Sequence, residues 1–511
     1  MPLPAPVPAP TPAPTSVPPP PAPAPSPAPT ITFSVLGAGL LDGNSTGAEQ
    51  ARDVVRDESG NIYVVGGTSS DDFPVTAGAY DTTYASGGAD RGSAGDMDVF
   101  VTKLDPQGRV IWSTYLGGPN YDRAYAVEVD ASHNVYVAGR AGPGFPTTPG
   151  VVQPAFAGDN IGGAYGRQDG FVAKLSADGT RLLWSTYFGE SGGAFVRDMD
   201  VDPLGRVHLG LPKVTGTDMS RFVTTNAPQN TRRGSTDSFY ARLASDAASV
   251  VFGTYLGGVE TAEPDANPAV RALPDGSAYF LTGEYGPGAP TTPGSFQPNY
   301  RGKEDMLLAR FSPTGAVVFC TYLGGAEDEF MDTHSLAVTP SGEPVISVGS
   351  RSFDYPVTDA SVHDADPRSD IATSILSADG AALLHSTLLG GGQGDSPEGI
   401  GVDAAGNVYI TGSTNSPSLP VTAGALHSSH LAGELEGFLL VYSPDLAQRR
   451  YVSYDGIPGE YANRSNTVAP DGTWLVVGAV WRLNPFPATA GRDSVINGTH
   501  AAFFRILQPA P

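Results

Sequence analysis

Short apolar runs separated by turn residues fill the chain from residue 31 onward. The runs are rich in Val, Ile, Tyr, Phe and Thr and are bounded by Gly, Asn, Asp and Pro. Such runs are typical of β-strands, and no helical periodicity lies between them. One unit of the pattern predicts four strands, at residues 124–130, 135–139, 171–175 and 183–188.

This unit recurs along the chain. STYLGG at 113–118 returns as STYFGE (185), GTYLGG (253), CTYLGG (320), STLLGG (386) and the degenerate VSYDG (452). Successive copies are separated by 72, 68, 67, 66 and 66 residues. Three further motifs, first seen as GNIYVVG (60), FPVTAG (73) and DVFVTKL (98), each occur seven times with this period. Regular four-stranded units without helices predict an all-β fold, a single seven-bladed β-propeller of four-stranded blades.

The two ends of the repeated region predict how the ring closes. The last copy stops after its third strand, at residues 501–507, whereas the region begins with an unpaired fourth-type strand at 31–37. Pairing of these segments would complete the last blade and cover open sheet edges. We expect Phe33, Val35 and Leu36 to provide the hydrophobic contact across that pair.

Residues 1–30 have a different composition. Pro alternates with Ala, Thr, Ser and Val without any charge, which predicts a disordered, extended linker or stalk ahead of a propeller domain at 31–511. A stalk separates a domain from an anchor, so we expect an extracellular or cell-surface tethered protein. The start, Met1–Pro4, lacks the basic and apolar regions of a signal peptide, so this expectation places the export signal outside this chain.

Charge, hydropathy and cysteine content exclude several classes of partner and of covalent cross-link. The 29 basic and 53 acidic side chains give a net charge of −24, which disfavours nucleic acid. No run of 18 apolar residues occurs, so we expect no direct membrane insertion. Cys320, the single cysteine, allows no intramolecular disulfide and is expected to be a small buried side chain.

The repeat resembles a known family. Its pattern, D-x-A-x-x-I-x-V-D-x-x-G-N-x-Y-V-x-G followed by F-P-T-T-x-G, D-A-F-V-x-K-L and S-T-Y-L-G-G, is similar to the SBBP-type β-propeller repeat of bacterial surface and secreted proteins. Units beginning at Glu49, Asp122 and Asp395 match it most closely. The resemblance implies a seven-bladed propeller and an exported protein, often a lipoprotein or wall-anchored. It implies no catalytic residues, because the family shares none.

Residues that recur in every unit are expected to be structural. The Tyr of STYLGG should pack between sheets, as Tyr115, Tyr187, Tyr255 and Tyr322. The Asp that opens each third strand should accept a hydrogen bond from a turn amide, as Asp98, Asp169, Asp237, Asp305 and Asp370.

Residues that differ between units but share one location are the better functional candidates. In a propeller that location is the mouth of the central channel, where the innermost strands begin. The predicted binding residues there are Arg52, Asp53, Tyr125, Arg197, Asp198, His334, Glu398 and Arg464. Arginines with a histidine and acids would suit an anionic or sugar ligand. The alternative is a water-filled channel whose charges pair with one another, for example Arg52 with Asp198.

Two short motifs resemble catalytic or metal-binding sequences, but neither supports such an assignment. GESGG at 189–193 fits the G-x-S-x-G pattern but lies between strands rather than in a strand-to-helix elbow, so we reject it. The acidic stretch at 363–370 offers oxygen atoms for Ca²⁺ but lacks the spacing of a calcium loop, and a solvated loop is the better interpretation. We assign no catalytic residue, metal ligand or cofactor.

The leading hypothesis is a monomeric, non-enzymatic surface or secreted binding module whose partner is a glycan or another surface protein. A propeller-type polysaccharide hydrolase or lyase, with its site at the channel mouth, is the alternative. Hydrolysis would need Glu398 and an Asp carboxylate to face each other about 5–9 Å apart. A purely structural spacer is a third interpretation.

Overall fold

The structure of the chain, a computed structural model, describes residues 30–43, 47–158, 164–190, 194–212, 218–234, 237–259, 267–332, 334–358, 369–431, 435–458, 463–480, 487–488 and 500–510. The expected linker at 1–29 and most of the acidic stretch at 363–370 therefore lie outside the described residues. So does the second half of GESGG, residues 191–193.

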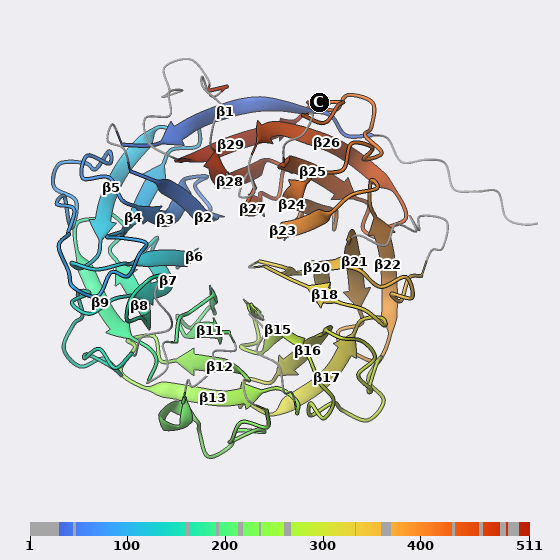
Figure 1. Cartoon of the computed structure of the whole chain (residues 1–511), viewed down its shortest axis with the longest axis horizontal. Helices are drawn as coiled ribbons and strands as arrows, with labels where there is room; N and C mark the ends of the chain where they lie inside the picture. The colour runs from blue at the N-terminus through green and yellow to red at the C-terminus, as the bar shows by residue number, and fades with distance from the viewer. Residues whose placement is uncertain are drawn as a thin grey trace, which may run out of the picture.

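Seven antiparallel sheets form a ring around a central channel, as the repeats predict (Figure 1). Within each sheet the strands follow one another from the channel outward. The first blade consists of β2 (Glu49–Arg56), β3 (Ile62–Thr68), β4 (Asp98–Leu104) and β5 (Val110–Leu116). The second consists of β6 (Arg123–Val129), β7 (Val135–Ala141), β8 (Asp169–Leu175) and β9 (Leu182–Tyr187). The third consists of β10 (Asp198–Val201), β11 (Val207–Leu211), β12 (Ser238–Leu243) and β13 (Val250–Leu256).

The remaining blades continue the same order. The fourth blade consists of β14 (Ala269–Ala272), β15 (Ala278–Glu284), β16 (Asp305–Phe311) and β17 (Val317–Leu323), and the fifth of β18 (Glu329–Phe330), β19 (Leu336–Val338), β20 (Pro344–Ser350), β21 (Asp370–Leu376) and β22 (Leu383–Leu389). The sixth consists of β23 (Asp395–Val402), β24 (Val408–Thr414), β25 (Glu436–Tyr442) and β26 (Arg449–Pro458). The seventh consists of β27 (Ser465–Val468), β28 (Trp474–Val480), β29 (Ala501–Pro509) and β1 (Phe33–Leu41). In the fifth blade two short strands, β18 and β19, both pair with β20. A 3₁₀ turn, η1 (Ser220–Phe222), interrupts the loop before β12.

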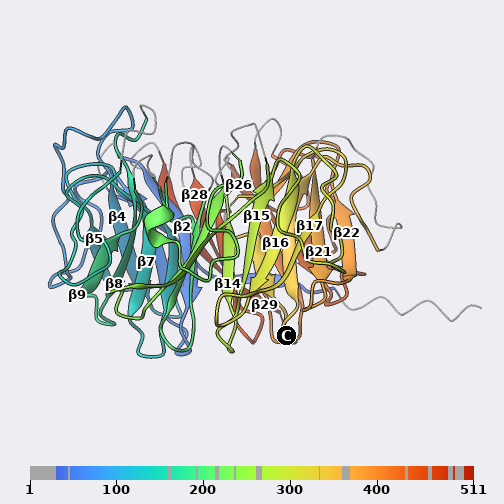
Figure 2. The same cartoon turned by 90° about the horizontal axis from the view of Figure 1, so that it is seen from below.

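The alternating strand directions give the ring two different faces (Figure 2). Long connections, from second to third strands and between blades, emerge on one face, which we call the loop face. Tight turns such as residues 57–61 lie on the other, which we call the turn face. No helix in the described part of the chain has the length and apolar character needed to cross a membrane.

The repeated residues have the structural roles expected of them. The Tyr115 hydroxyl donates to the Ser70 carbonyl (2.9 Å) and that of Tyr187 to the Gly142 carbonyl (3.0 Å), so each buried ring also ties a loop to its blade. The Asp98 carboxylate accepts the backbone N–H of Ala85 (2.8 Å), and the same contact recurs at the start of the next three blades' third strands. Cys320 is fully buried.

The first and last strands close the ring, with one correction to the expected contacts. β1 pairs antiparallel with β29 from Phe33 opposite Pro509 to Leu41 opposite Ala502, so it begins two residues later and ends four residues later than the predicted 31–37. A β-bulge between Val35 and Gly37 breaks the alternation of side chains. Contrary to the expectation, Val35 and Leu36 are 39% and 48% exposed. Phe33 instead packs against three aromatic rings, those of Tyr409, Tyr451 and Trp474.

Substitution of Phe33 tests this closure. Phe33→Ala should lower the free energy of unfolding by about 3–5 kcal/mol, because it leaves a cavity among the three rings. Leu36→Ala, in the same strand but outward-facing, should change it by no more than about 0.5 kcal/mol. Urea denaturation of the two variants measures both values. Equal losses would show that β1 does not hold the ring through Phe33.

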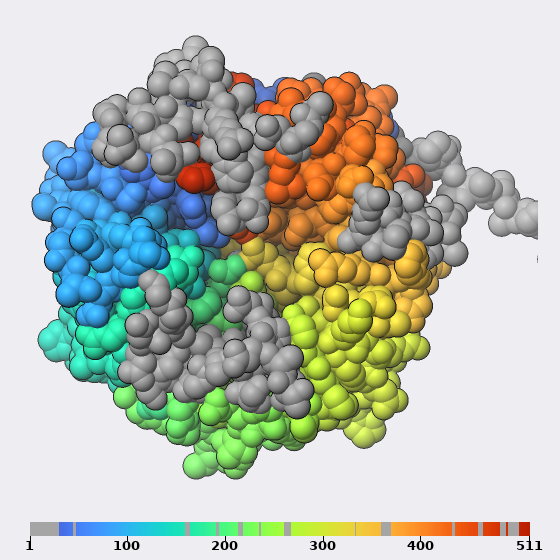
Figure 3. Space-filling view, in the orientation of Figure 1, coloured from blue at the N-terminus to red at the C-terminus, as the bar shows by residue number. Residues whose placement is uncertain are grey.

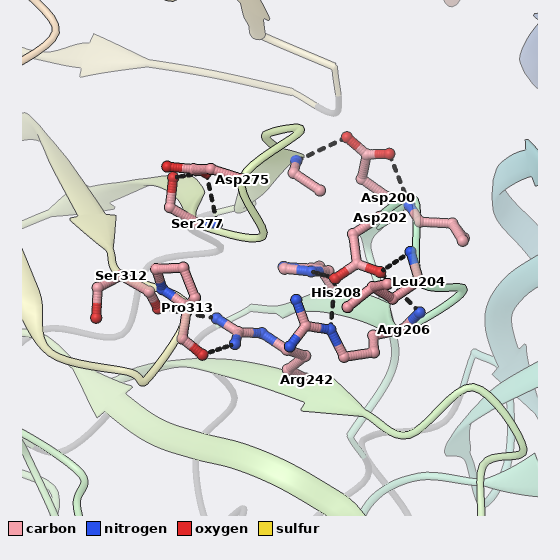
Figure 4. Close-up of polar contacts among 12 residues, drawn as sticks. Asp200, Asp202, Leu204, Arg206, His208, Arg242, Asp275, Ser277, Ser312 and Pro313 are labelled. Carbon is pink, nitrogen blue, oxygen red and sulfur yellow. Dashed lines mark hydrogen bonds and ion pairs between the residues drawn. The ribbon is translucent and has the colours of Figure 1, made fainter.

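The third blade departs from the repeat at its turn face (Figure 4). His208 occupies the place of Tyr63, Tyr136 and Tyr409, whose hydroxyls bind the Asp of the adjacent turn. Its ring is fully buried, with Nε2 3.3 Å from Asp202 Oδ2 and Nδ1 2.8 Å from the Tyr240 hydroxyl.

Nearby, Arg242 fastens the third blade to the fourth. This fully buried side chain donates to the backbone carbonyls of Pro313 (2.6 Å) and Ser312 (3.2 Å), in the tight turn between β16 and β17 (Figure 4). In the next blade Arg310 reaches the carbonyl of Ala378 (3.1 Å) in the same way. The basic residue of the third strand is thus a repeated contact between blades.

The buried histidine predicts a pH dependence of stability. Burial lowers the pKa of His208 below its ordinary 6.5, so the unfolded chain gains a proton in acid before the folded chain does. Stability from this residue is therefore complete above about pH 6.5 and falls as the pH drops below it. His208→Tyr restores the residue of the other blades and keeps a hydroxyl toward Asp202. Wild type should lose more stability than this variant between about pH 7 and pH 5. Parallel pH curves in urea denaturation would contradict the assignment.

Candidate functional site

A local irregularity in three of the innermost strands directs predicted binding residues toward the channel. β2, β6 and β23 each contain a β-bulge at the same place in the repeat, which leaves Arg52, Tyr125 and Glu398 out of the strand pairing. A bulge adds one residue and re-aims its side chain. All eight predicted residues are at most 9% exposed.

The repeat glycine makes the bulge possible. Gly66, Gly139 and Gly412 lie opposite the three bulges, in the second strand of their blades. A Cβ atom at these positions would lie 1.8, 2.1 and 2.1 Å from the carbonyl oxygens of Gln50, Arg123 and Ser396. Only glycine admits so close a backbone approach. The glycine at the end of the GNIYVVG motif therefore helps to set the shape of the mouth.

Four side chains form a charged cluster at the loop-face end of the channel, which we call the mouth network. Arg197 and Arg464 both form ion pairs with Asp332, and Arg464 Nη1 also lies 2.6 Å from Glu398 Oε2. Burial raises the pKa of Asp332, but Arg197 and Arg464 outweigh it and hold that pKa well below its usual range. Burial, together with the neighbouring Asp332, raises the pKa of Glu398 to about 8. This shift favours the protonated form of Glu398, whose carboxyl group is hydrogen-bonded to the Asp332 carboxylate.

Sequence reasoning missed Asp332. It lies two residues before His334, between the short strands β18 and β19 of the fifth blade, outside the two positions compared among the repeats. The available signal was the spacing, because residues two apart on an extended strand share a face. Arg123 occupies the corresponding place in the second blade, seven residues before the Asp of its turn, and was missed for the same reason.

Deeper in the channel, His334 joins three blades. Its Nε2 atom lies 3.5 Å from Asp53 Oδ1 and its Nδ1 atom 3.5 Å from Asp198 Oδ1. Burial lowers the pKa of His334, but the two carboxylates outweigh it and raise that pKa. Asp53 also accepts hydrogen bonds from the Ser465 hydroxyl (2.7 Å) and the Val127 N–H (2.8 Å), which belong to the two adjoining blades.

The pairing of Arg52 with Asp198 that the sequence suggested is replaced by another. Asp198 binds Arg271 Nη1 at 2.7 Å, as well as His334, while the guanidinium of Arg52 lies 5.7 Å from the centre of the Tyr125 ring. Below this level a cavity of about 250 Å³ extends toward the turn face. Glu128, Asp200 and Arg271 line it. Burial raises the pKa of Asp200 to about 6.

Tyr125 is the centre of a second cluster on the loop-face side. The guanidinium carbons of Arg197, Arg123, Arg140 and Arg52 lie 4.6, 4.9, 5.3 and 5.7 Å from its ring centre. Arg123 also donates to its hydroxyl. Burial alone would raise the pKa of Tyr125, but these four cations lower it to about 7.

Glu398 and Asp332 lack the separation that the hydrolase alternative needs. Glu398 contacts Asp332 directly, whereas glycoside hydrolysis requires room for a sugar, and in inverting enzymes also a water, between carboxyl groups about 5–9 Å apart. Across the described segments, no cluster of three or more His, Cys, Asp or Glu side chains could hold a metal ion. Figure 3 shows the loop face, on which segments from all parts of the chain meet around the centre of the ring.

The fold and the repeats define the class of protein, a seven-bladed β-propeller. Residues 43–74, 111–145 and 386–419 match the family described as SBBP, β-propeller repeat, so the chain carries repeats of this family, as the sequence pattern indicates. No curated protein matches the sequence.

Solved structures resemble the chain in fold alone. A protein of unknown function from Dyadobacter fermentans is 12% identical, covers 94% of this chain and 100% of its own, and has a TM-score of 0.39. An oligogalacturonate lyase in complex with manganese is 10% identical, with coverages of 94% and 96% and a TM-score of 0.43. A quinohemoprotein alcohol dehydrogenase from Comamonas testosteroni is 11% identical, with coverages of 93% and 76% and a TM-score of 0.42. Likeness at this level carries no argument about activity.

The tyrosine cluster predicts an unusual titration. Among the 21 tyrosines, Tyr125 should ionise near neutral pH, whereas burial raises the pKa of others, such as Tyr187 and Tyr409. Tyrosinate absorbance of the folded protein should show a one-residue step near pH 7 that Tyr125→Phe removes. Tyr187→Phe is the matched control and should retain the step. Identical titrations of wild type and Tyr125→Phe below about pH 9 would contradict the lowered pKa.

Proposed function

We propose that the chain is a non-enzymatic, secreted or cell-surface binding module that takes the anionic groups of an acidic glycan at the loop-face mouth of its channel. One observation carries this proposal, an excess of buried arginine. Five arginines converge there, against the two carboxyl groups of the mouth network: Arg52, Arg123, Arg140, Arg197 and Arg464.

The charge balance at the mouth favours an anion. The pKa of Glu398 is raised to about 8 and that of Tyr125 is lowered only to about 7, so Asp332 is the one fully ionised acid among the five arginines at neutral pH. Guanidinium groups match carboxylate and sulfate groups with paired hydrogen bonds. The net charge of −24 does not cancel this local surplus, because charges beyond about 8 Å are screened at physiological salt.

Two further features favour binding of a glycan over chemistry on it. The acid pair Glu398–Asp332 is in contact, which supports a bracing role rather than the separated acid and base of a hydrolase. Tyr165 and Phe195 are half-buried at the edge of the arginine cluster and offer apolar ring faces against which the C–H face of a pyranose can pack.

Binding assays on residues 30–511 test the proposal. Calorimetry should detect binding to polygalacturonate or sulfated dextran, weakened by added salt, and none to neutral dextran. Arg52→Gln should weaken this binding about tenfold, since it removes one mouth charge without disturbing the ion pairs of Asp332. Arg351→Gln removes the same charge elsewhere on the loop face, from a 51%-exposed side chain, and should have no effect.

Two outcomes would overturn the proposal. Absence of binding to every acidic glycan would leave the mouth as a lining whose charges serve the fold. Release of reducing ends or unsaturated sugars from a bound polymer would instead show an enzyme.

Arg197 and Arg464 are unsuitable targets for substitution, because the loss of either removes an ion-pair partner of the buried Asp332 carboxylate.

A further inference from the structure

Two neighbouring arginines in the second blade differ from the others at the mouth. Arg123 in β6 and Arg140 in β7 are directly opposite each other in the strand register. Their side chains are 7% and 6% exposed, on the channel side of the loop face. Two like charges side by side in a buried place are unfavourable unless something offsets them.

Aromatic rings surround this arginine pair. The guanidinium carbon of Arg140 lies 4.2 Å from the ring centre of Phe195 and 4.6 Å from that of Tyr165. That of Arg123 lies 5.5 Å from both Tyr121 and Tyr165. Tyr121 and Tyr165 are themselves 4.8 Å apart. Ring faces attract cations, but they provide no acceptor for the guanidinium N–H groups.

Carboxylates are missing from this place as far as the structure describes the chain. Arg140 has no side-chain hydrogen bond or ion pair with any described residue, and the described partner of Arg123 is the Tyr125 hydroxyl. The Nε atoms of both are buried without a hydrogen-bond acceptor among those residues. Burial lowers the pKa of Arg140. Such a pair is poorly satisfied in the free protein and presents fork-shaped donors to an incoming anion.

The contrast with the mouth network indicates separate roles. Arg197 and Arg464 already form ion pairs with Asp332, which joins segments from three blades, although their Nε atoms also lack an acceptor among the described residues. Arg140 holds nothing comparable. The aromatic edge beside it, Tyr165 and Phe195, is half-buried and therefore in reach of a ligand on the loop face.

We propose that Arg123 and Arg140 form the subsite for the carboxylate or sulfate group of an acidic sugar, whose ring packs against Tyr165 and Phe195. This inference rests on the proposed function and deepens it, because it places the anion in the second blade rather than in the mouth network. It also implies that the two buried arginines serve ligand binding and lower the stability of the folded protein. The subsite requires an acid group and a sugar ring together.

The conservative variant Arg140→Gln gives the sharpest test. Affinity for tri-galacturonate or for sulfated dextran, measured by calorimetry, should fall at least tenfold. Thermal stability should stay equal or rise, because a buried charge without an acid partner is removed. Arg351→Gln is the matched control, since Arg351 also lies over a ring, that of Phe330 at 5.1 Å, but has Asp328 as its partner. It should leave affinity unchanged.

A second variant separates sugar from anion. Tyr165→Leu removes the ring face but no charge, so it should weaken tri-galacturonate while leaving the salt dependence of binding unchanged. Preference for tri-galacturonate over sulfated dextran identifies a uronate carboxylate as the natural group, and the reverse preference identifies a sulfate.

The outcomes separate this inference from the proposed function. If wild type binds an acidic glycan and Arg140→Gln binds it equally well, the subsite is wrong and the binding module stands. If Arg140→Gln loses affinity and also melts earlier than wild type, the arginine is part of the fold and the subsite is again wrong. If wild type binds none of tri-galacturonate, polygalacturonate and sulfated dextran, both proposals fail together.

Discussion

Closure of the ring by β1 is the interaction on which the other features depend. Blades in a propeller contact only their neighbours, so the curvature that seven sheets accumulate is fixed when the first and last strands pair. β1 and β29 share one sheet with β27 and β28, and Phe33 fills an aromatic pocket that also includes Tyr451 of the sixth blade. The closed ring in turn brings residues from all parts of the sequence to one narrow axis.

That axis imposes a second requirement, the compensation of buried charge. Each bulge directs a side chain inward, and the channel is narrow enough for His334 to contact Asp53 and Asp198 from two other blades. Ionised groups so far from water must be paired or must lose their charge. The channel uses both solutions. Asp198 pairs with Arg271 and His334, whereas Glu398 retains its proton beside Asp332. Arg140 has no carboxylate partner among the described residues, and Tyr125 is the acidic group that lowers its electrostatic cost.

The sequence was sufficient for the architecture because the repeat period depends on spacing alone. The motif that ends as AAFFRIL without a fourth strand led directly to the pairing of β1 with β29. Individual contacts were less predictable. Val35 and Leu36 were expected to provide hydrophobic contact, but a β-bulge interrupts the strand between Val35 and Gly37, and both side chains are exposed. A bulge depends on close backbone approach, which a single sequence does not display.

For the mouth residues, too, the sequence predicted the shared location but not the individual contacts. That Arg52, Tyr125, Arg197 and Glu398 share one level followed from their place in the repeat. Their partners did not, because a difference of one residue along an innermost strand changes the depth in the channel. Asp198 therefore meets Arg271 and His334, while Arg197, one residue earlier, meets Asp332. Binding by these eight residues remains a prediction.

Depth also organises charge along the channel. Arginines predominate at the loop-face end, whereas Glu128 and Asp200 lie with Arg271 in the cavity toward the turn face. An anion approaching the axis therefore meets attraction at one end and carboxylates at the other. The His334–Asp53–Asp198 contacts lie between the two ends. In a protein with a net charge of −24, the channel thus carries its concentration of positive charge at one end only.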